Sequence, residues 1–457
     1  MPPDETREQD VGALLGAAPL GGLQITVLVL AFAIAAIDGM DAQIIAFAAP
    51  EIVKDFDVPR ERLGPVFSSA LVGMALGAFL FGPLGDRVGR KRVAVLCTFW
   101  FGAMTLLTVV SNSLTQLMVI RFITGLGLGG ALPNAVTLVS EYAPARRRAM
   151  LVTIMYIGFA VGGVLGSAVG GQIIPRFGWT SIFWFGGLLP LALGVVLLFA
   201  LPESLQYLAR RGGRDEEIRR VLGRLRGCTP PPADVTFVVS GRHLDSSPRE
   251  LFSWPRRRNT FMLWIAFFIN LLVLFTLMNW LPTLLTNAGV SLEQALRVAL
   301  AFNLGAIGGP LLLAWASDRY DPRLMLGGFF FCGALCFMAV GIGAPDLGWL
   351  IATGVLTGFF AGGAQVGLYP VATQIYPAAV RVTGVAWAQV WGRIGSIIGP
   401  WLGGLLLWLG LGEYFVVFGA PLLLAAVAIW MMRPASRADD AAQVAPAMAS
   451  AAPSTRR

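Results

Sequence analysis

Apolar segments of about 20 residues recur along the whole chain, and each is long enough to cross the hydrocarbon core of a bilayer. The chain is 56% hydrophobic and only 13% charged, which excludes an ordinary soluble protein of 457 residues. We therefore predict an all-α membrane protein, because a helix satisfies its own backbone hydrogen bonds in lipid. The twelve expected spans lie near residues 23–49, 63–84, 93–111, 115–137, 149–174, 179–201, 260–286, 294–317, 324–343, 347–370, 383–408 and 412–432.

Short motifs of the first half recur in the second half at a nearly constant offset. Asp86-Arg87 matches Asp318-Arg319 at an offset of 232, and Arg148 matches Arg381 at an offset of 233. Such a duplication predicts two pseudo-symmetric six-helix bundles with a binding site at their interface. The glycines of two corresponding helices also match at an offset of 233, namely Gly162, Gly166, Gly170 and Gly171 with Gly395, Gly399, Gly403 and Gly404.

The segments outside the spans complete the expected domain organisation. We expect an N-terminal cytoplasmic segment at 1–22, bundles at 23–201 and 259–432, and a disordered cytoplasmic tail at 433–457. The central segment 202–258 is rich in arginine and proline, which predicts short amphipathic helices and a linker. A regulatory role and a simple connecting role both remain open for it.

The basic residues cluster in alternate loops, which is typical of cytoplasmic loops in membrane proteins. This pattern accounts for the net charge of +8 without a nucleic-acid partner, and it places both termini in the cytoplasm. The excess of arginine over lysine suggests a GC-rich bacterial genome, and we expect the protein in the bacterial inner membrane. The loop residues that carry the pattern are Arg87, Arg90, Lys91, Arg92, Arg146, Arg147, Arg148, Arg319, Arg323, Arg381, Arg433 and Arg437.

No catalytic or metal-binding pattern is apparent in the sequence. The four cysteines have no disulfide or metal spacing, and the single histidine, His243, excludes a multi-histidine metal site. The glycine string Gly125–Gly130 lies inside an apolar helix, where small residues indicate close helix packing rather than a phosphate loop. We expect no cofactor and no enzymatic activity.

Two acids, Asp38 and Asp41, interrupt the first apolar segment. They are three residues apart, so they share one face of a helix, and each costs about 2.5–3.5 kcal/mol at bilayer depth. Such residues usually mark an ion or substrate path, although a buried structural ion pair is the alternative. Arg121 lies at a similar depth on its own helix, so it can pair with Asp41 if the two helices are neighbours. Loss of that partner to a substrate carboxylate would favour protonation of Asp41.

The loop between the second and third spans, Gly85-Asp86-Arg87-Val88-Gly89-Arg90-Lys91-Arg92, resembles the signature loop of the major facilitator superfamily. In that family, the loop locks helices at the cytoplasmic face and releases them as the transporter changes state. The resemblance implies a degraded second copy after the eighth span. The implied gating residues are Gly85, Asp86, Arg87, Gly89, Arg90, Asp318, Arg319 and Arg381.

Asp38-Gly39-Met40-Asp41 is similar to the Asp-Gly-x-Asp motif of the aromatic acid:proton symporter family. The typical substrates of that family are benzoates with hydroxyl or methoxyl groups, such as 4-hydroxybenzoate, protocatechuate and vanillate. Arg381 and Arg393 on the eleventh helix also match. The resemblance implies proton coupling through Asp38, Asp41, Arg121 and Glu141.

Arg393 lies near the middle of the predicted helix 383–408, where an unpaired guanidinium is costly. It shares a face with Gln389, and Trp387 and Trp391 form an aromatic stripe to one side. Because arginine binds carboxylates bidentately and tryptophan stacks on rings, this surface suits a planar aromatic acid. The alternative is that Arg393 pairs with an acid of another helix and that the tryptophans face lipid.

Three further polar residues, Asn270, Gln365 and Tyr369, are candidates for binding substrate hydroxyls, although each can instead join two helices. Asn270 follows Asp38 by 232 residues, so the second half keeps a polar group there without the charge. Proton coupling should therefore be asymmetric between the halves.

These features predict a monomeric transporter that imports an aromatic carboxylate with protons by alternating access. The remaining alternatives are a sugar, polyol or other organic-acid porter, a drug or metabolite efflux antiporter, and a membrane sensor for aromatic acids.

Overall fold

The computed structural model describes residues 7–225, 232, 235–239, 251–252, 257–317, 319–342, 346–376 and 380–432. The first half contains six long helices, which are α2 (Gly22–Asp55), α3 (Leu63–Val88), α4 (Arg90–Leu107), α5 (Leu114–Tyr142), α6 (Arg148–Phe177) and α7 (Thr180–Ala200). The second half contains α10 (Arg257–Asn287), α11 (Leu292–Ser317), α12 (Pro322–Val340), α13 (Leu347–Thr357), the π-helical turn η5 (Gly358–Gly362), α14 (Gly363–Ile375), α15 (Arg381–Leu405) and α16 (Leu411–Trp430).

Eleven helices of the described chain are long and apolar enough to cross a membrane, with α13, η5 and α14 counted as one span. A twelfth helix, α15, has 25 residues, or about 37 Å at 1.5 Å per residue, and packs beside α10 and α3. The predicted all-α membrane fold is therefore confirmed. One predicted span, 347–370, is longer than expected and is interrupted by the π-helical turn.

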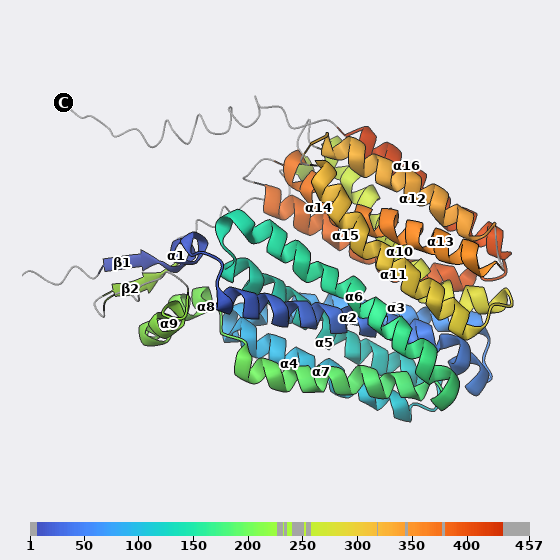
Figure 1. Cartoon of the computed structure of the whole chain (residues 1–457), viewed down its shortest axis with the longest axis horizontal. Coiled ribbons are helices and arrows are strands. Elements are labelled where there is room, and N and C mark those ends of the chain that lie inside the picture. Colours follow the sequence, from blue (N-terminus) through green and yellow to red (C-terminus); the bar gives the residue numbers. More distant parts are fainter. Residues whose placement is uncertain are drawn as a thin grey trace, which may run out of the picture.

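The two halves lie side by side with their helices roughly parallel, as Figure 1 shows in blue to green and in yellow to red. Among the described helices, the main contacts between the halves are those of α6 with α11, α3 with α15, and α2 with α10. Within the first half, α2 and α6 approach very closely because the glycines of each helix face the backbone of the other helix. A Cβ atom on Gly39 would lie 2.0 Å from the carbonyl oxygen of Phe159. Gly39 thus fixes the helix segment that carries Asp38 and Asp41.

A small unit covers one end of the first half, which we call the terminal side (Figure 1). It contains α1 (Val11–Ala17), α8 (Leu205–Arg211), α9 (Asp215–Leu222) and the strands β1 (Arg7–Asp10) and β2 (Val235–Val238). The strands pair in parallel with Arg7 opposite Val235. The short helices match the expectation for the central segment, but the strand pairing was not predicted because β1 is short and polar. The tail at 433–457 and most of 226–256 lie outside the described residues.

The halves share a large buried core at the opposite end, which we call the far side, and a small cluster of Leu71 with Leu271 and Phe275 also joins them. The first half contributes to that shared core only through the far-side parts of its helices, such as 44–52, 63–67 and 174–183. Its terminal-side core is separate and contains no described residue of the second half. The far side is also bridged by hydrogen bonds between Gln43 and Asn303, at 3.2 and 2.9 Å, and from Ser68 to the Ile397 carbonyl at 2.7 Å. The described structure is therefore closed at the far side.

Candidate functional site

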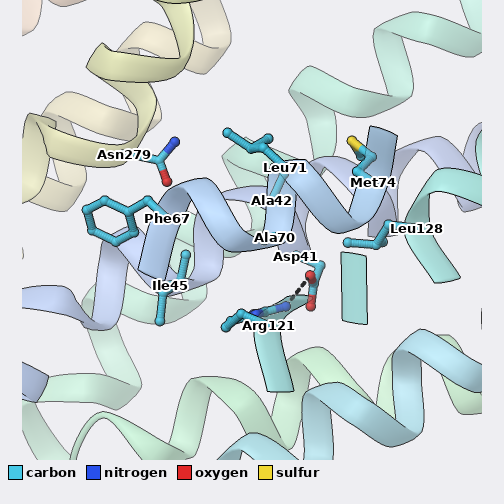
Figure 2. Close-up of a pocket in the computed structure, with 10 residues that line it drawn as sticks. All are labelled: Asp41, Ala42, Ile45, Phe67, Ala70, Leu71, Met74, Arg121, Leu128 and Asn279. Atoms are coloured by element: carbon cyan, nitrogen blue, oxygen red, sulfur yellow. Dashed lines mark hydrogen bonds and ion pairs between the residues drawn. The ribbon is translucent and has the colours of Figure 1, made fainter. Parts of the chain in front are cut away.

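The predicted contact between Asp41 and Arg121 is present and is buried inside the first half. Arg121 Nη2 donates to Asp41 Oδ2 at 2.6 Å, and both side chains are 1% exposed. Thr105 donates to the other carboxylate oxygen at 2.6 Å, and the guanidinium lies over the Phe183 ring. Figure 2 shows the pair at one end of a pocket. Asp41 is thus a fully partnered carboxylate held by α4 and α5.

Asp38 lies one turn before Asp41 on α2 and has a different environment. Its side chain is completely buried, and neither carboxylate oxygen has a hydrogen-bond partner among the described residues. Arg393 of the second half and Asp41 both act on it electrostatically. A buried, unpartnered carboxylate near an arginine is unusual, because burial of a charge is costly without a partner.

Arg393 is partly exposed on α15 and takes part in none of the ion pairs of the described chain. Its Nη1 instead lies 3.1 Å from the Met74 sulfur on α3, so it reaches across the interface between the halves. Met74 also lines the pocket next to Asp41 and Arg121 (Figure 2). Met74 therefore contacts Arg393 and also lines the pocket that contains Arg121.

Asn270, Gln365 and Tyr369 form one polar cluster beside Arg393. Asn270 Nδ2 on α10 donates to Gln365 Oε1 on α14 at 2.5 Å, and Tyr369 lies one turn after Gln365 on the same helix. Arg393 acts electrostatically on both Tyr369 and Tyr156. Arg393, Tyr369 and the Asn270–Gln365 pair are thus brought together at the interface.

Tyr156 on α6 was missed in the sequence, because a lone tyrosine in an apolar segment carries no charge signal. Its hydroxyl is also influenced by Tyr369 and Asp38, so it belongs to the same region. A usable signal was the internal repeat, since Tyr156 shifted by 233 residues is Gln389, which had been singled out.

The tryptophan stripe of α15 lies away from this cluster. Trp387 and Trp391 stack on Trp264, with ring centroids 6.2 and 5.3 Å apart, and are 41% and 37% exposed. Gln389 is also exposed. Trp391 precedes Arg393 by two residues, so it projects from nearly the opposite side of the helix. These rings therefore pack on α10 through Trp264, and their role in substrate binding stays a prediction.

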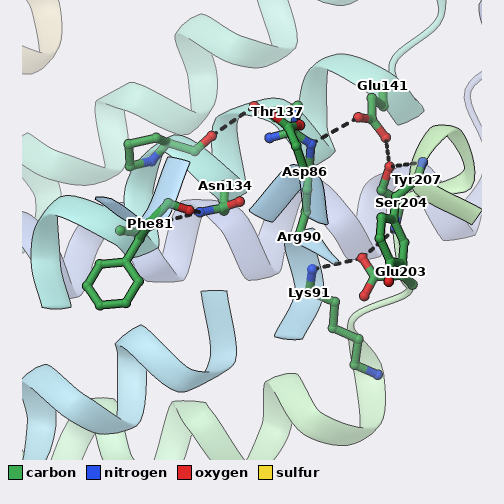
Figure 3. A network of polar contacts seen from close by, with 12 residues as sticks. Phe81, Asp86, Arg90, Lys91, Asn134, Thr137, Glu141, Glu203, Ser204 and Tyr207 are labelled. Carbon is green, nitrogen blue, oxygen red and sulfur yellow. Dashed lines mark hydrogen bonds and ion pairs between the residues drawn. The ribbon is translucent and has the colours of Figure 1, made fainter. Parts of the chain in front are cut away.

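The residues of the signature loop form a network at the terminal side (Figure 3). Arg90 Nη2 lies 2.5 Å from Asp86, and Arg90 Nε lies 3.3 Å from Glu141. Ser204 donates to Glu141, and Glu203 accepts from the Lys91 backbone N–H at 2.9 Å. Glu141, which was grouped with the proton-coupling acids, thus lies in the loop network rather than beside Asp38.

The glycines of this loop make room for neighbouring polar groups. A Cβ atom on Gly85 would lie 2.0 Å from Asn134 Oδ1, and one on Gly89 would lie 2.4 Å from Glu203 Oε2. Gly89 also has a φ of 116°, which strains any other residue. Arg87 is exposed and takes part in no ion pair of the described chain.

The second copy of the loop is not built in the same way. Arg319 lies over the Trp315 ring at 4.1 Å, and Arg381 donates to the Tyr376 carbonyl at 3.3 Å. Asp318 lies outside the described residues. Within the described ranges, no three His, Cys, Asp or Glu side chains are placed to hold a metal ion.

Comparison with known proteins identifies the family. The chain matches the model of the Major Facilitator Superfamily over residues 31–342 and 298–455. It is 38% identical to a 4-hydroxybenzoate transporter of Pseudomonas aeruginosa, covering 94% of this chain and 97% of that one. It is 37% identical to a gallate transporter of Pseudomonas putida, with coverages of 92% and 94%, and 32% identical to a benzoate transport protein of Acinetobacter baylyi, with 93% of both.

A solved structure supports the same fold. The inward-facing, occupied form of a bacterial homolog of the human lysosomal transporter Spinster matches with a TM-score of 0.69. It is 17% identical and covers 90% of this chain and 97% of its own length. The chain therefore belongs to the Major Facilitator Superfamily and is a multi-pass membrane transporter of a small molecule, not an enzyme.

Proposed function

We propose that the protein imports an aromatic carboxylate together with protons across the bacterial inner membrane, with both termini in the cytoplasm. The observation that carries this proposal is that two side chains at the interface of the halves each lack a partner. Arg393 has no carboxylate partner in the described chain, and Asp38 has no donor for either oxygen. An anionic substrate gives Arg393 a carboxylate partner, and a proton neutralises the buried carboxylate of Asp38.

Arg393 holds the substrate carboxylate in this proposal. A guanidinium at membrane depth is stabilised by an anion, and a bidentate pair fixes the orientation of a planar acid. Met74 is a flexible side chain that can yield its place at Nη1 to the carboxylate. The names of the relatives support the substrate class, because they include transporters of 4-hydroxybenzoate, gallate and benzoate.

Asp38 carries the transported proton. A buried carboxylate becomes neutral more easily than it stays charged without a partner, and a substrate anion at Arg393 removes the positive charge that opposes protonation. Binding of the acid and binding of the proton then favour each other. Asp41 and Arg121 hold α2, α4 and α5 together. A substrate carboxylate that competes for Arg121 favours protonation of Asp41.

Alternating access requires the two ends of the interface to exchange their contacts. The closed far side, with the Gln43–Asn303 bridge, faces the periplasm in this proposal, since the arginine-rich loops lie at the terminal side. Asp86, Arg90 and Glu141 restrain the terminal side of the first half. Arg319 and Arg381 take part in the same rearrangement from the second half. One chain contains both halves, so a monomer is sufficient.

Uptake of labelled 4-hydroxybenzoate by cells that express the chain tests the proposal. Benzoate, protocatechuate and vanillate should compete, glucose should not, and a protonophore should abolish accumulation. Accumulation that a protonophore leaves unchanged would contradict proton coupling. Competition by glucose alone would favour a sugar porter instead.

A further inference from the structure

The side chain of Met74 on α3 occupies one donor of Arg393 across the interface of the halves. Its sulfur lies 3.1 Å from Arg393 Nη1, and a thioether is only a weak acceptor. Met74 is 6% exposed, so its neighbours rather than solvent determine where the side chain lies. Arg393 is therefore held in the described structure by a contact that a carboxylate can replace with a much stronger one.

The pocket beside Met74 has room for the end of this side chain (Figure 2). Its volume is about 20 Å³, which is enough for one water-sized group, such as a methyl group, but not for an aromatic acid. Arg121 forms part of the wall, and its Nε and Nη1 are buried without an acceptor in the described chain. A sulfur that entered the pocket would therefore meet a second guanidinium with unused donors.

Movement of Met74 is confined to its side chain, because α5 holds the backbone of α3 at this point. A Cβ atom on Gly129 would lie 2.1 Å from the Met74 carbonyl oxygen, and one on Gly125 would lie 2.9 Å from the Met74 nitrogen. The two helices are thus in backbone contact there. Methionine is unbranched and has three rotatable bonds, so the sulfur can change its position without a shift of the helix.

We propose that Met74 is a placeholder for the substrate carboxylate. Its sulfur occupies Arg393 when the transporter is empty, and it moves into the pocket beside Arg121 when the carboxylate binds. This inference rests on the proposed function, in which Arg393 holds the carboxylate. Each substrate molecule has to displace the sulfur, so Met74 lowers the substrate affinity, and the pocket determines whether the side chain can move away. Met74 is thus a positioning residue that acts through Arg393.

Direct binding to the purified full chain in lipid nanodiscs tests the sign of this effect. Met74→Leu keeps the volume but removes the acceptor, so 4-hydroxybenzoate should bind about threefold more tightly than to wild type. Met74→Gln gives Arg393 a stronger acceptor and should weaken binding by about tenfold. The neutral 4-hydroxybenzamide, which has no carboxylate to replace the sulfur, should bind wild type and both variants with similar affinity. Met155→Leu, at a buried methionine of the same core, is the matched control and should bind the acid as wild type does.

A second set of variants tests where the sulfur goes. Ala70 lines the pocket, so Ala70→Val fills the space that the Met74 side chain would enter. This change should weaken 4-hydroxybenzoate binding about tenfold in wild type and alter it by less than about twofold in the Met74→Ala background, where no sulfur has to move. Ala75→Val, on the same helix but outside the lining of the pocket, should leave the affinity unchanged in both backgrounds.

The outcomes separate this inference from the proposal on which it rests. Equal or weaker acid binding by Met74→Leu, or tighter binding by Met74→Gln, overturns the placeholder role, and so does an effect of Ala70→Val that persists in the Met74→Ala background. In these cases acid binding to wild type still stands. Absence of 4-hydroxybenzoate binding to wild type overturns the proposed function and this inference with it. If one of the two Met74 variants does not fold, the other decides, because their expected effects have opposite signs.

Discussion

The two buried regions around Asp41 and around Asp38 are one helical turn apart on α2, yet they are built in opposite ways. Asp41 has a donor on each oxygen, from Arg121 and Thr105, all within the first half. Asp38 has no donor on either oxygen, and Arg393 of the second half acts on it electrostatically. The carboxylate of Asp41 is fully partnered within one bundle, although Nε and Nη1 of Arg121 are buried without a hydrogen-bond partner in the described chain, whereas the carboxylate of Asp38 at the interface is available to ligands and protons. The two aspartates of α2 therefore have different roles.

The largest effect should come from breaking the ion pair between Asp41 and Arg121. Asp41→Asn leaves the Arg121 charge buried without a carboxylate, which we expect to destabilise the protein by about 3–5 kcal/mol and to abolish accumulation. Thermal unfolding in detergent and uptake in cells measure the two effects. The double variant Asp41→Asn with Arg121→Gln should regain most of the stability because no charge is left unpaired. If the double variant is as unstable as the single one, the pair is not what Asp41 contributes.

Removal of the charge at Asp38 should abolish accumulation without the loss of stability expected for Asp41→Asn. Asp38→Asn breaks no described hydrogen bond, so the unfolding temperature should stay at or above the wild-type value while proton-driven accumulation is lost. Exchange of labelled for unlabelled substrate, which needs no net proton movement, should continue. A fall in stability as large as that of Asp41→Asn would show that the two regions do not differ as described.

The role of Arg393 in the region around Asp38 can be tested by changing the charge of the ligand. Arg393→Gln should weaken binding of 4-hydroxybenzoate by about 10- to 100-fold, because a charge-assisted hydrogen bond is lost. The neutral amide analogue should bind wild type and variant with similar, weak affinity. Equal competition by acid and amide in both proteins would remove Arg393 as the carboxylate anchor.

The smallest effect should be at the far side, where Gln43 and Asn303 bridge the halves. Gln43→Leu removes both hydrogen bonds to Asn303 and should shift the conformational equilibrium towards far-side opening by about tenfold. Single-molecule energy transfer between labels at Val58 and Gly289, in a cysteine-free background, reports the separation of the halves. An unchanged population of the closed state would mean that the bridge does not hold the far side.

The sequence was informative wherever a charge stood out against apolar surroundings. The spans and the contact of Asp41 with Arg121 followed from length, helix direction and depth alone. The asymmetry between Asp38 and Asp41 could not be predicted, because it depends on which helix supplies Thr105 and on the reach of Arg393 towards Met74. The orientation of Trp387 and Trp391 depends in the same way on the position of Trp264 on a distant segment. Tyr156 and the pairing of β1 with β2 had no charge or periodicity to indicate them.

The most direct test of the account is substrate-driven proton movement in proteoliposomes that contain the purified protein and a pH-sensitive dye. For wild type, we expect addition of 4-hydroxybenzoate outside to acidify the lumen as the acid anion and protons enter together. Asp38→Asn should exchange substrate at a rate close to wild type without acidification. Acidification by Asp38→Asn equal to that of wild type would contradict the assignment of the transported proton to Asp38.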